Sequence, residues 1–214
     1  MRKAVVGLAV AGLVLAGASP AQALAESAVA SGSVGSVDAT FDGAPLQVDP
    51  LAACDTAGSG SAVTSGDEVA GFYEFGPGSS TCTLDASGVA SADVSGELFR
   101  LDVLRAFGGP RIRVTDYSVE CGTTETGSSA SWYIGGLSGI RVPPELPSNH
   151  VVTIPGSGPG APPLAEVTLN ETIVPEPPDG SMTVNMMRIH LFPEGGNDEV
   201  GGEIVVGSVS CAPF

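Results

Sequence analysis

Apolar and polar residues alternate with a period of two in short runs along most of the chain. In one such run Met187, Ile189 and Leu191 alternate with Arg188 and His190. This period places alternate side chains on opposite faces of a β-strand. The runs are rich in Val, Ile and Thr, and the chain's 30 Gly and 17 Pro punctuate them. The pattern predicts an all-β protein, an antiparallel β-sandwich with long Pro- and Gly-rich loops.

The predicted strands are the alternating runs between turn signals. Asp42-Gly43 predicts a tight hairpin turn between the first two strands. Ten of the 17 Pro fall within residues 143–178. Because Pro lacks the N–H that a central strand needs, we expect loops and edge strands there. These prolines serve either as stiff connectors or as a rigid recognition surface. The predicted strands are 36–41, 46–48, 68–75, 89–104, 112–121, 131–134, 139–142, 151–154, 167–170, 183–192 and 204–211.

A faint internal repeat links two parts of the chain. Residues 99–104 and 187–192 are both strand-like with an Arg between apolar residues. Each is followed by a turn and by a strand that ends Ser-Val-x-Cys, at Cys121 and Cys211. The repeat predicts two similar hairpins with these cysteines at corresponding ends, and chance similarity between amphipathic strands is the alternative.

The N-terminus has the layout of a secretory signal peptide. Arg2 and Lys3 precede an apolar run, and Ala21-Gln22-Ala23 forms a small-x-small cleavage site. We predict a signal peptide over 1–23, with cleavage after Ala25 as an alternative. A flexible N-terminus over 24–33 and a single β-rich domain over 34–214 should follow. The apolar run is short for a membrane span, and no second one follows, so we expect a secreted protein with no span after cleavage.

The four cysteines suit an exported chain. Their even number favours two disulfides, and their wide spacing matches neither a zinc site nor a Cys-x-x-Cys redox motif. Four cysteines allow three pairings. We favour Cys54 with Cys82 and Cys121 with Cys211, and the repeat supports the second pair.

The charge excludes some partners. The formal net charge is −16, and beyond the leader six Arg and no Lys stand against 24 acidic residues. Phosphate contacts need cations, so we predict no nucleic-acid ligand and no binding to anionic lipid.

The sequence contains no recognisable catalytic motif. The chain lacks a Gly-x-Ser-x-Gly pentad. Either of its two histidines, His150 and His190, could act as a general base, but without a nucleophile motif we interpret both as surface residues. Two oxygen-rich turns, 65–68 and 195–199, do not have the spacing of an EF-hand. We therefore predict no catalytic residues, no metal site and no cofactor.

Three residues are candidates for other roles. Trp132 and Tyr133 are an adjacent aromatic pair of the kind that exposes a platform to a ligand, although Trp132 also suits a half-buried position. Asn185 falls on the apolar side of its strand. An inward amide without partners would be costly, so Asn185 is a candidate for structural hydrogen bonding.

Several segments, in order along the chain, carry a family resemblance: 39–46 leading to Cys54, then 118–121, 151–156, 167–171, 183–185 with 189–190, and 204–211. Together they resemble the choice-of-anchor P family of exported Gram-positive bacterial proteins. The resemblance implies an extracellular domain whose members differ in how they attach to the cell surface, and it implies no activity or catalytic residue. This chain shows no C-terminal anchor, which leaves its attachment open.

Together these features predict a secreted, disulfide-stabilised β-domain. Its expected role is structural or binding, outside the cell or at the cell envelope, with an unidentified extracellular or envelope ligand. The alternative is a secreted hydrolase of envelope polymers that uses an acidic pair. That enzyme would need two carboxylates facing each other in a cleft, with one desolvated enough to hold a proton near neutral pH.

Overall fold

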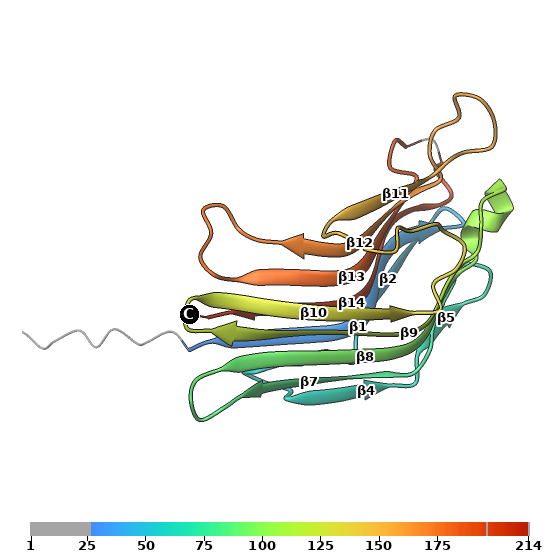
Figure 1. The fold of residues 1–214 in the computed structure, drawn as a ribbon. Coiled ribbons are helices and arrows are strands. Elements are labelled where there is room, and N and C mark those ends of the chain that lie inside the picture. Colours follow the sequence, from blue (N-terminus) through green and yellow to red (C-terminus); the bar gives the residue numbers. More distant parts are fainter. Residues whose placement is uncertain (1–26, 196, 214) are drawn as a thin grey trace, which may run out of the picture.

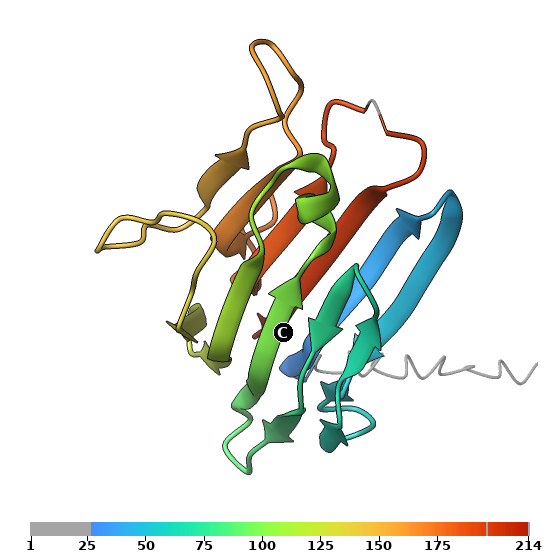
Figure 2. The same cartoon turned by 90° about the vertical axis from the view of Figure 1, so that its right-hand side faces the viewer.

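The computed structural model describes residues 27–195 and 197–213. The predicted leader, residues 1–23, lies outside these residues. Within them, two antiparallel sheets of seven strands each pack face to face (Figures 1 and 2). The predicted all-β sandwich is confirmed.

Sheet A holds both ends of the described chain. Its strand order is β11-β12-β13-β14-β1-β2, and β3 also pairs with β1. Its strands are β1 (Val29–Phe41), β2 (Ala44–Leu51), β3 (Cys54–Asp55), β11 (His150–Ile154), β12 (Ala165–Ile173), β13 (Met182–Leu191) and β14 (Gly201–Ala212).

Sheet B is formed by the middle of the chain. Its order is β10-β9-β8-β6-β5, while β7 pairs with β8 and β4 with β7. A 3-10 helix, η1 (Val103–Phe107), connects β8 to β9. The strands are β4 (Ser61–Thr64), β5 (Asp67–Val69), β6 (Tyr73–Phe75), β7 (Gly78–Leu84), β8 (Ala90–Leu101), β9 (Ile112–Thr124) and β10 (Gly127–Gly135).

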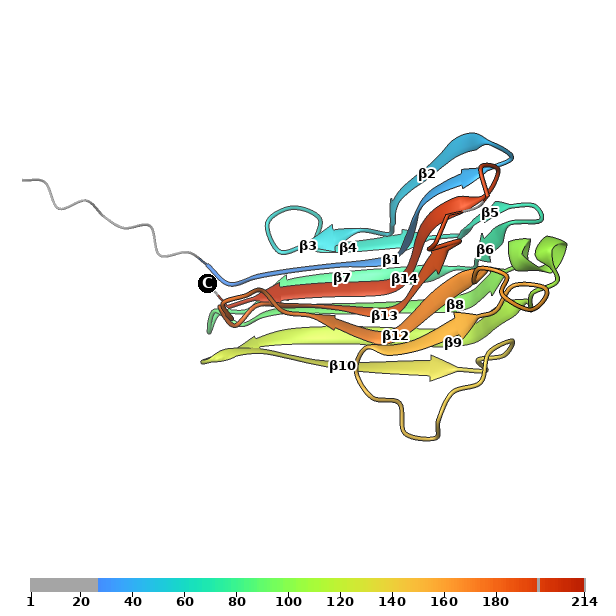
Figure 3. The ribbon, with the colours of Figure 1, turned by 90° about the horizontal axis from the view of Figure 1, so that it is seen from above.

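Both sheets bend along their strands (Figures 1 and 3). Single residues with a left-handed backbone lie within the long strands: Leu98 with φ 52° in β8, Asn170 with φ 49° in β12 and Gly207 with φ 62° in β14. At such a residue the alternation of side chains shifts by one position, so the positions that face the core change from even to odd numbers or the reverse. We call this a phase shift. In β8, for example, Val94 is buried before this point and Phe99 after it.

The hairpins and disulfides agree with the sequence. β8 pairs with β9 in sheet B and β13 with β14 in sheet A, as the repeat predicted. Cys54 bonds to Cys82 and Cys121 to Cys211, so the favoured pairing is confirmed. Both bonds link sheet A to sheet B. Asp42 and Gly43 have φ values of 51° and 74°, which matches the predicted tight turn between β1 and β2.

The Pro-rich segment surrounds the edge of sheet A. All ten prolines of residues 143–178 lie outside strands, in the loops before β11, between β11 and β12, and between β12 and β13. The prediction of loops around an edge strand is therefore confirmed, because β11 ends the strand order of its sheet.

Some boundaries differ from the prediction. Val29 to Ser33 were expected to be flexible, but they pair with β14. The expected strand 68–75 is two strands, because a turn with Gly71 at φ 81° separates β5 from β6. Residues 139–142 form no strand, since Gly139 has φ 94° and only Ser138 bridges to β9. β8 ends at Leu101, where η1 follows shortly.

Candidate functional site

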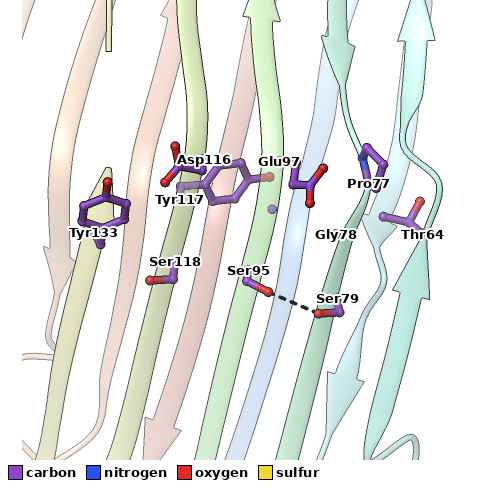
Figure 4. Close-up of a pocket in the computed structure, with 11 residues that line it drawn as sticks. Thr64, Pro77, Gly78, Ser79, Ser95, Glu97, Asp116, Tyr117, Ser118 and Tyr133 are labelled. Atoms are coloured by element: carbon purple, nitrogen blue, oxygen red, sulfur yellow. Dashed lines mark hydrogen bonds between the residues drawn. The ribbon is translucent and has the colours of Figure 1, made fainter. Parts of the chain in front are cut away.

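The outer face of sheet B carries a row of hydroxyl groups. Ser79 on β7 lies opposite Ser95 on β8, and Ser95 lies opposite Ser118 on β9. Ser118 in turn lies opposite Tyr133 on β10. We call these four residues the serine row. They line a groove of about 500 Å³ (Figure 4).

The groove has an aromatic end and an acidic side. The Tyr133 side chain stands at one end of the row and Thr64 at the other (Figure 4). Tyr133 is 55% exposed. Glu97 and Asp116, which lie opposite each other on β8 and β9, border the row on one side. Both are exposed.

A second depression continues along the same two strands. It has a volume of about 400 Å³ and contains Asp93 and Glu120, which also lie opposite each other. The Ser131 hydroxyl donates to Glu120 Oε1 at 2.5 Å. We call the two depressions together the serine groove. The second depression is also lined by Ser91, Ala92, Cys121, Gly122, Ser129 and Ala130.

The floor of the groove depends on packing beneath it. Gly96 of β8 is buried, and a Cβ there would come within 2.3 Å of the Tyr117 ring. The Tyr117 hydroxyl donates to the Val34 carbonyl of β1 at 2.9 Å. Burial raises the pKa of this hydroxyl well above its usual value. The neutral ring therefore supports the floor of the groove from inside the sandwich.

The two candidate ligand contacts point in opposite directions. Trp132 is partly buried and packs against the core, whereas its neighbour Tyr133 faces the serine groove. They do not form a joint platform. Sequence reasoning identified Tyr133 but missed the serine row, because exposed serines are common in strands and only strand register brings these together.

Asn185 lies on the outer face of sheet A rather than toward the core. Val184 and Met186, on either side of Asn185 in sequence, are buried in the core, so Asn185 points the other way. After Met186 the alternation shifts by one position, and Met187 and Ile189 are the buried residues. Asn185 is nevertheless buried, and its Nδ2 donates to Glu171 Oε2 at 2.7 Å. The prediction of its face was wrong because alternation was extended across the shift.

Asn185 belongs to a small charged cluster. Glu171 is also buried, and its Oε1 lies 2.6 Å from Arg188 Nη2. Arg188 Nη1 lies 3.3 Å from Glu203 Oε1. An ionised carboxylate in this position is stabilised by both the guanidinium and the amide. We assign the cluster a structural role.

Other titratable groups lie away from the groove. Hydrogen bonds from Ser87 lower the pKa of Asp85, and those from Ser181 lower the pKa of Asp179. Asp85 lies in the turn after β7, and Asp179 lies in the loop before β13. In the part of the chain that the structure describes, no three His, Cys, Asp or Glu side chains gather as metal ligands. In the oxygen-rich turn at 65–68, Asp67 accepts a hydrogen bond from the Tyr73 hydroxyl.

Comparisons with known proteins give no relative for this arrangement. No family model, curated protein or solved structure matches the chain. Among residues 27–195 and 197–213, no helix has the length and apolar character needed to cross a bilayer.

Proposed function

We propose that this protein is an extracellular binding domain that holds an extended polysaccharide in the serine groove and does no chemistry on it. The observation that carries the proposal is the serine row itself. Three hydroxyls from three strands and an exposed tyrosine line one groove on the outer face of sheet B.

Sugars suit such a surface. A pyranose ring has an apolar face that packs on an aromatic ring, and its hydroxyls exchange hydrogen bonds with Ser and carboxylate side chains. The paired strands of sheet B present these groups side by side on one face. The resemblance to the choice-of-anchor P family and the predicted leader support an extracellular setting for this ligand, at the cell envelope.

The acidic-pair hydrolase is the second candidate, and Glu97 with Asp116 is the pair it would use. These residues lie directly opposite each other in the groove. A general acid needs a carboxyl group whose pKa burial raises. Both side chains are exposed, which favours binding over hydrolysis. If the protein releases sugar from cell walls and Glu97→Gln abolishes this release, the hydrolase replaces the binding domain.

The test is cosedimentation of the purified protein with isolated Gram-positive cell walls. We expect saturable pelleting that Tyr133→Ala and Ser95→Val each weaken about two- to tenfold, the effect of one lost contact. Ser31→Val is the matched control, since Ser31 is an exposed serine of a strand in sheet A. Pelleting that neither groove variant changes, or that Ser31→Val weakens equally, would contradict a binding site in the serine groove.

A further inference from the structure

The serine groove is acidic without a compensating cation. Asp93 lies opposite Glu120, and Glu97 lies opposite Asp116. Like charges directly opposite on neighbouring antiparallel strands are unfavourable. Among the described residues that line the two depressions, none is Lys, Arg or His.

Elsewhere some of the arginines form ion pairs with carboxylates. Arg100 lies 2.7 Å from both Glu74 and Asp102, and Arg188 lies 2.6 Å from Glu171. These pairs are outside the serine groove. The four groove carboxylates therefore present a concentrated negative potential to any ligand that lies along β8 and β9.

The carboxylate pairs are regularly placed relative to the hydroxyls. Glu97 is four positions after Asp93 on β8, a distance of about 13 Å along a strand. Ser95 and Ser118 of the serine row lie between the two pairs. An extended ligand along the strands would meet an acidic pair, a hydroxyl pair and a second acidic pair in turn, with Tyr133 beside the hydroxyls.

We infer that the ligand is a polysaccharide of amino sugars with free amino groups. Its ammonium groups lie at the two carboxylate pairs, where charge-assisted hydrogen bonds are strongest. Its ring hydroxyls contact the serine row, and one sugar face packs on Tyr133. This inference rests on the proposed function and names the chemistry of the ligand for the same groove.

The test compares two soluble probes by calorimetry: glucosamine oligomers with free amino groups and the same oligomers fully N-acetylated. We expect at least tenfold tighter binding of the free-amine oligomer. This preference should shrink as salt is raised, because salt screens exposed charges. We expect two double variants to weaken binding of the free-amine oligomer about tenfold or more each: Asp93→Asn/Glu120→Gln and Glu97→Gln/Asp116→Asn.

The control for charge is Asp49→Asn/Glu125→Gln. It makes the same change in net charge at exposed positions outside the serine groove and should leave the affinity within about twofold. All six positions are exposed, and the replacements keep the side-chain shape, so unchanged thermal melting is expected for every variant.

Three results would overturn the inference. Equal affinity for the two oligomers would show that amino groups are not recognised. An equal loss of affinity in the control variant would show that only overall charge matters. Binding of oligolysine as tightly as the free-amine oligomer would indicate a basic peptide instead. If wall pelleting still depends on Tyr133 in these cases, the proposed function stands; if it does not, both fail.

Discussion

The hydroxyl of Tyr117 crosses the sandwich from β9 to the backbone of β1. Its acceptor is the carbonyl of Val34. Near Val34 the alternation of buried residues in β1 shifts by one position, and the register between β1 and β14 skips a pair. A buried carbonyl left without a donor costs free energy. The Tyr117 side chain therefore provides this carbonyl with a hydrogen bond that pairing with β14 does not provide.

Replacing Tyr117 tests this contact. Tyr117→Phe should lower the free energy of unfolding by about 1–2 kcal/mol, because the ring stays packed while the Val34 carbonyl loses its donor. Urea unfolding followed by fluorescence measures the change. Tyr133→Phe, which alters an exposed hydroxyl, should change the stability by less than about 0.5 kcal/mol. Equal effects of the two substitutions would argue against the bond to Val34.

Asp85 offers a pH-dependent test at the same scale. Its Oδ1 accepts from the Ser87 hydroxyl at 2.6 Å and from the Ser87 and Val89 amides at 2.8 and 3.0 Å. The Ser87 contacts hold the pKa of Asp85 below its ordinary value. Since the folded pKa is lowered, the resulting stabilisation is complete above the unfolded pKa of about 3.9 and is lost as pH falls through the folded pKa.

We expect an NMR titration of the carboxyl groups to give Asp85 a lower pKa in the unmodified protein than in the Ser87→Ala variant. Asp179, which accepts from Ser181 in the same way, serves as the internal control. Its pKa should stay low in the Ser87→Ala protein. An Asp85 titration that this substitution leaves unchanged would contradict the assigned cause.

At the scale of elements, alternation predicted strands well where both period and apolar content were clear. β9, β13 and β14 lie close to their predicted ranges because their apolar residues alternate over most of each strand. β7 was missed, since Gly78-Ser79-Ser80 has no apolar alternation. The serine groove was missed with it, because strand order and register, which the sequence does not reveal, bring Ser79 beside Ser95.

The phase shifts were the second limit of prediction. Asn170 and Leu98 have left-handed backbones although neither is glycine, and no turn motif marks them. The alternation of buried positions also shifts in β13, between Met186 and Met187, although no residue of that strand has a positive φ, and Asn185 lies before this shift. The partners of Asn185 could therefore not be found by alternation.

The charged cluster on β12, β13 and β14 gives an element-scale prediction. Arg188→Met should destabilise the protein by about 2–4 kcal/mol, because Glu171 would remain buried without its cation. Glu171→Gln/Arg188→Met should recover part of this loss, since no charge is then buried. Arg113→Met, at an exposed strand position, should cost less than about 0.5 kcal/mol. Chemical denaturation of the three variants checks the order; a double variant less stable than Arg188→Met would contradict it.

At the scale of the molecule, the two disulfides fasten the sandwich at different points. Cys54–Cys82 joins β3 to β7, and Cys121–Cys211 joins the two repeated hairpins through β9 and β14. Their sequence separations are 28 and 90 residues. Because a cross-link restricts the unfolded chain more when it closes a longer loop, the second bond should stabilise the fold more.

The chain-entropy model makes this difference measurable. Cys121→Ala/Cys211→Ala should lower the free energy of unfolding by about 4–5 kcal/mol, and Cys54→Ala/Cys82→Ala by about 3–4 kcal/mol. All four side chains are buried, so the cavities left by the two pairs are similar and the comparison reflects loop length. Urea unfolding of both variants under non-reducing conditions gives the order. If loss of Cys54–Cys82 were the more harmful, native contacts around β3 and β7, rather than restriction of the unfolded chain, would set the contribution of these bonds.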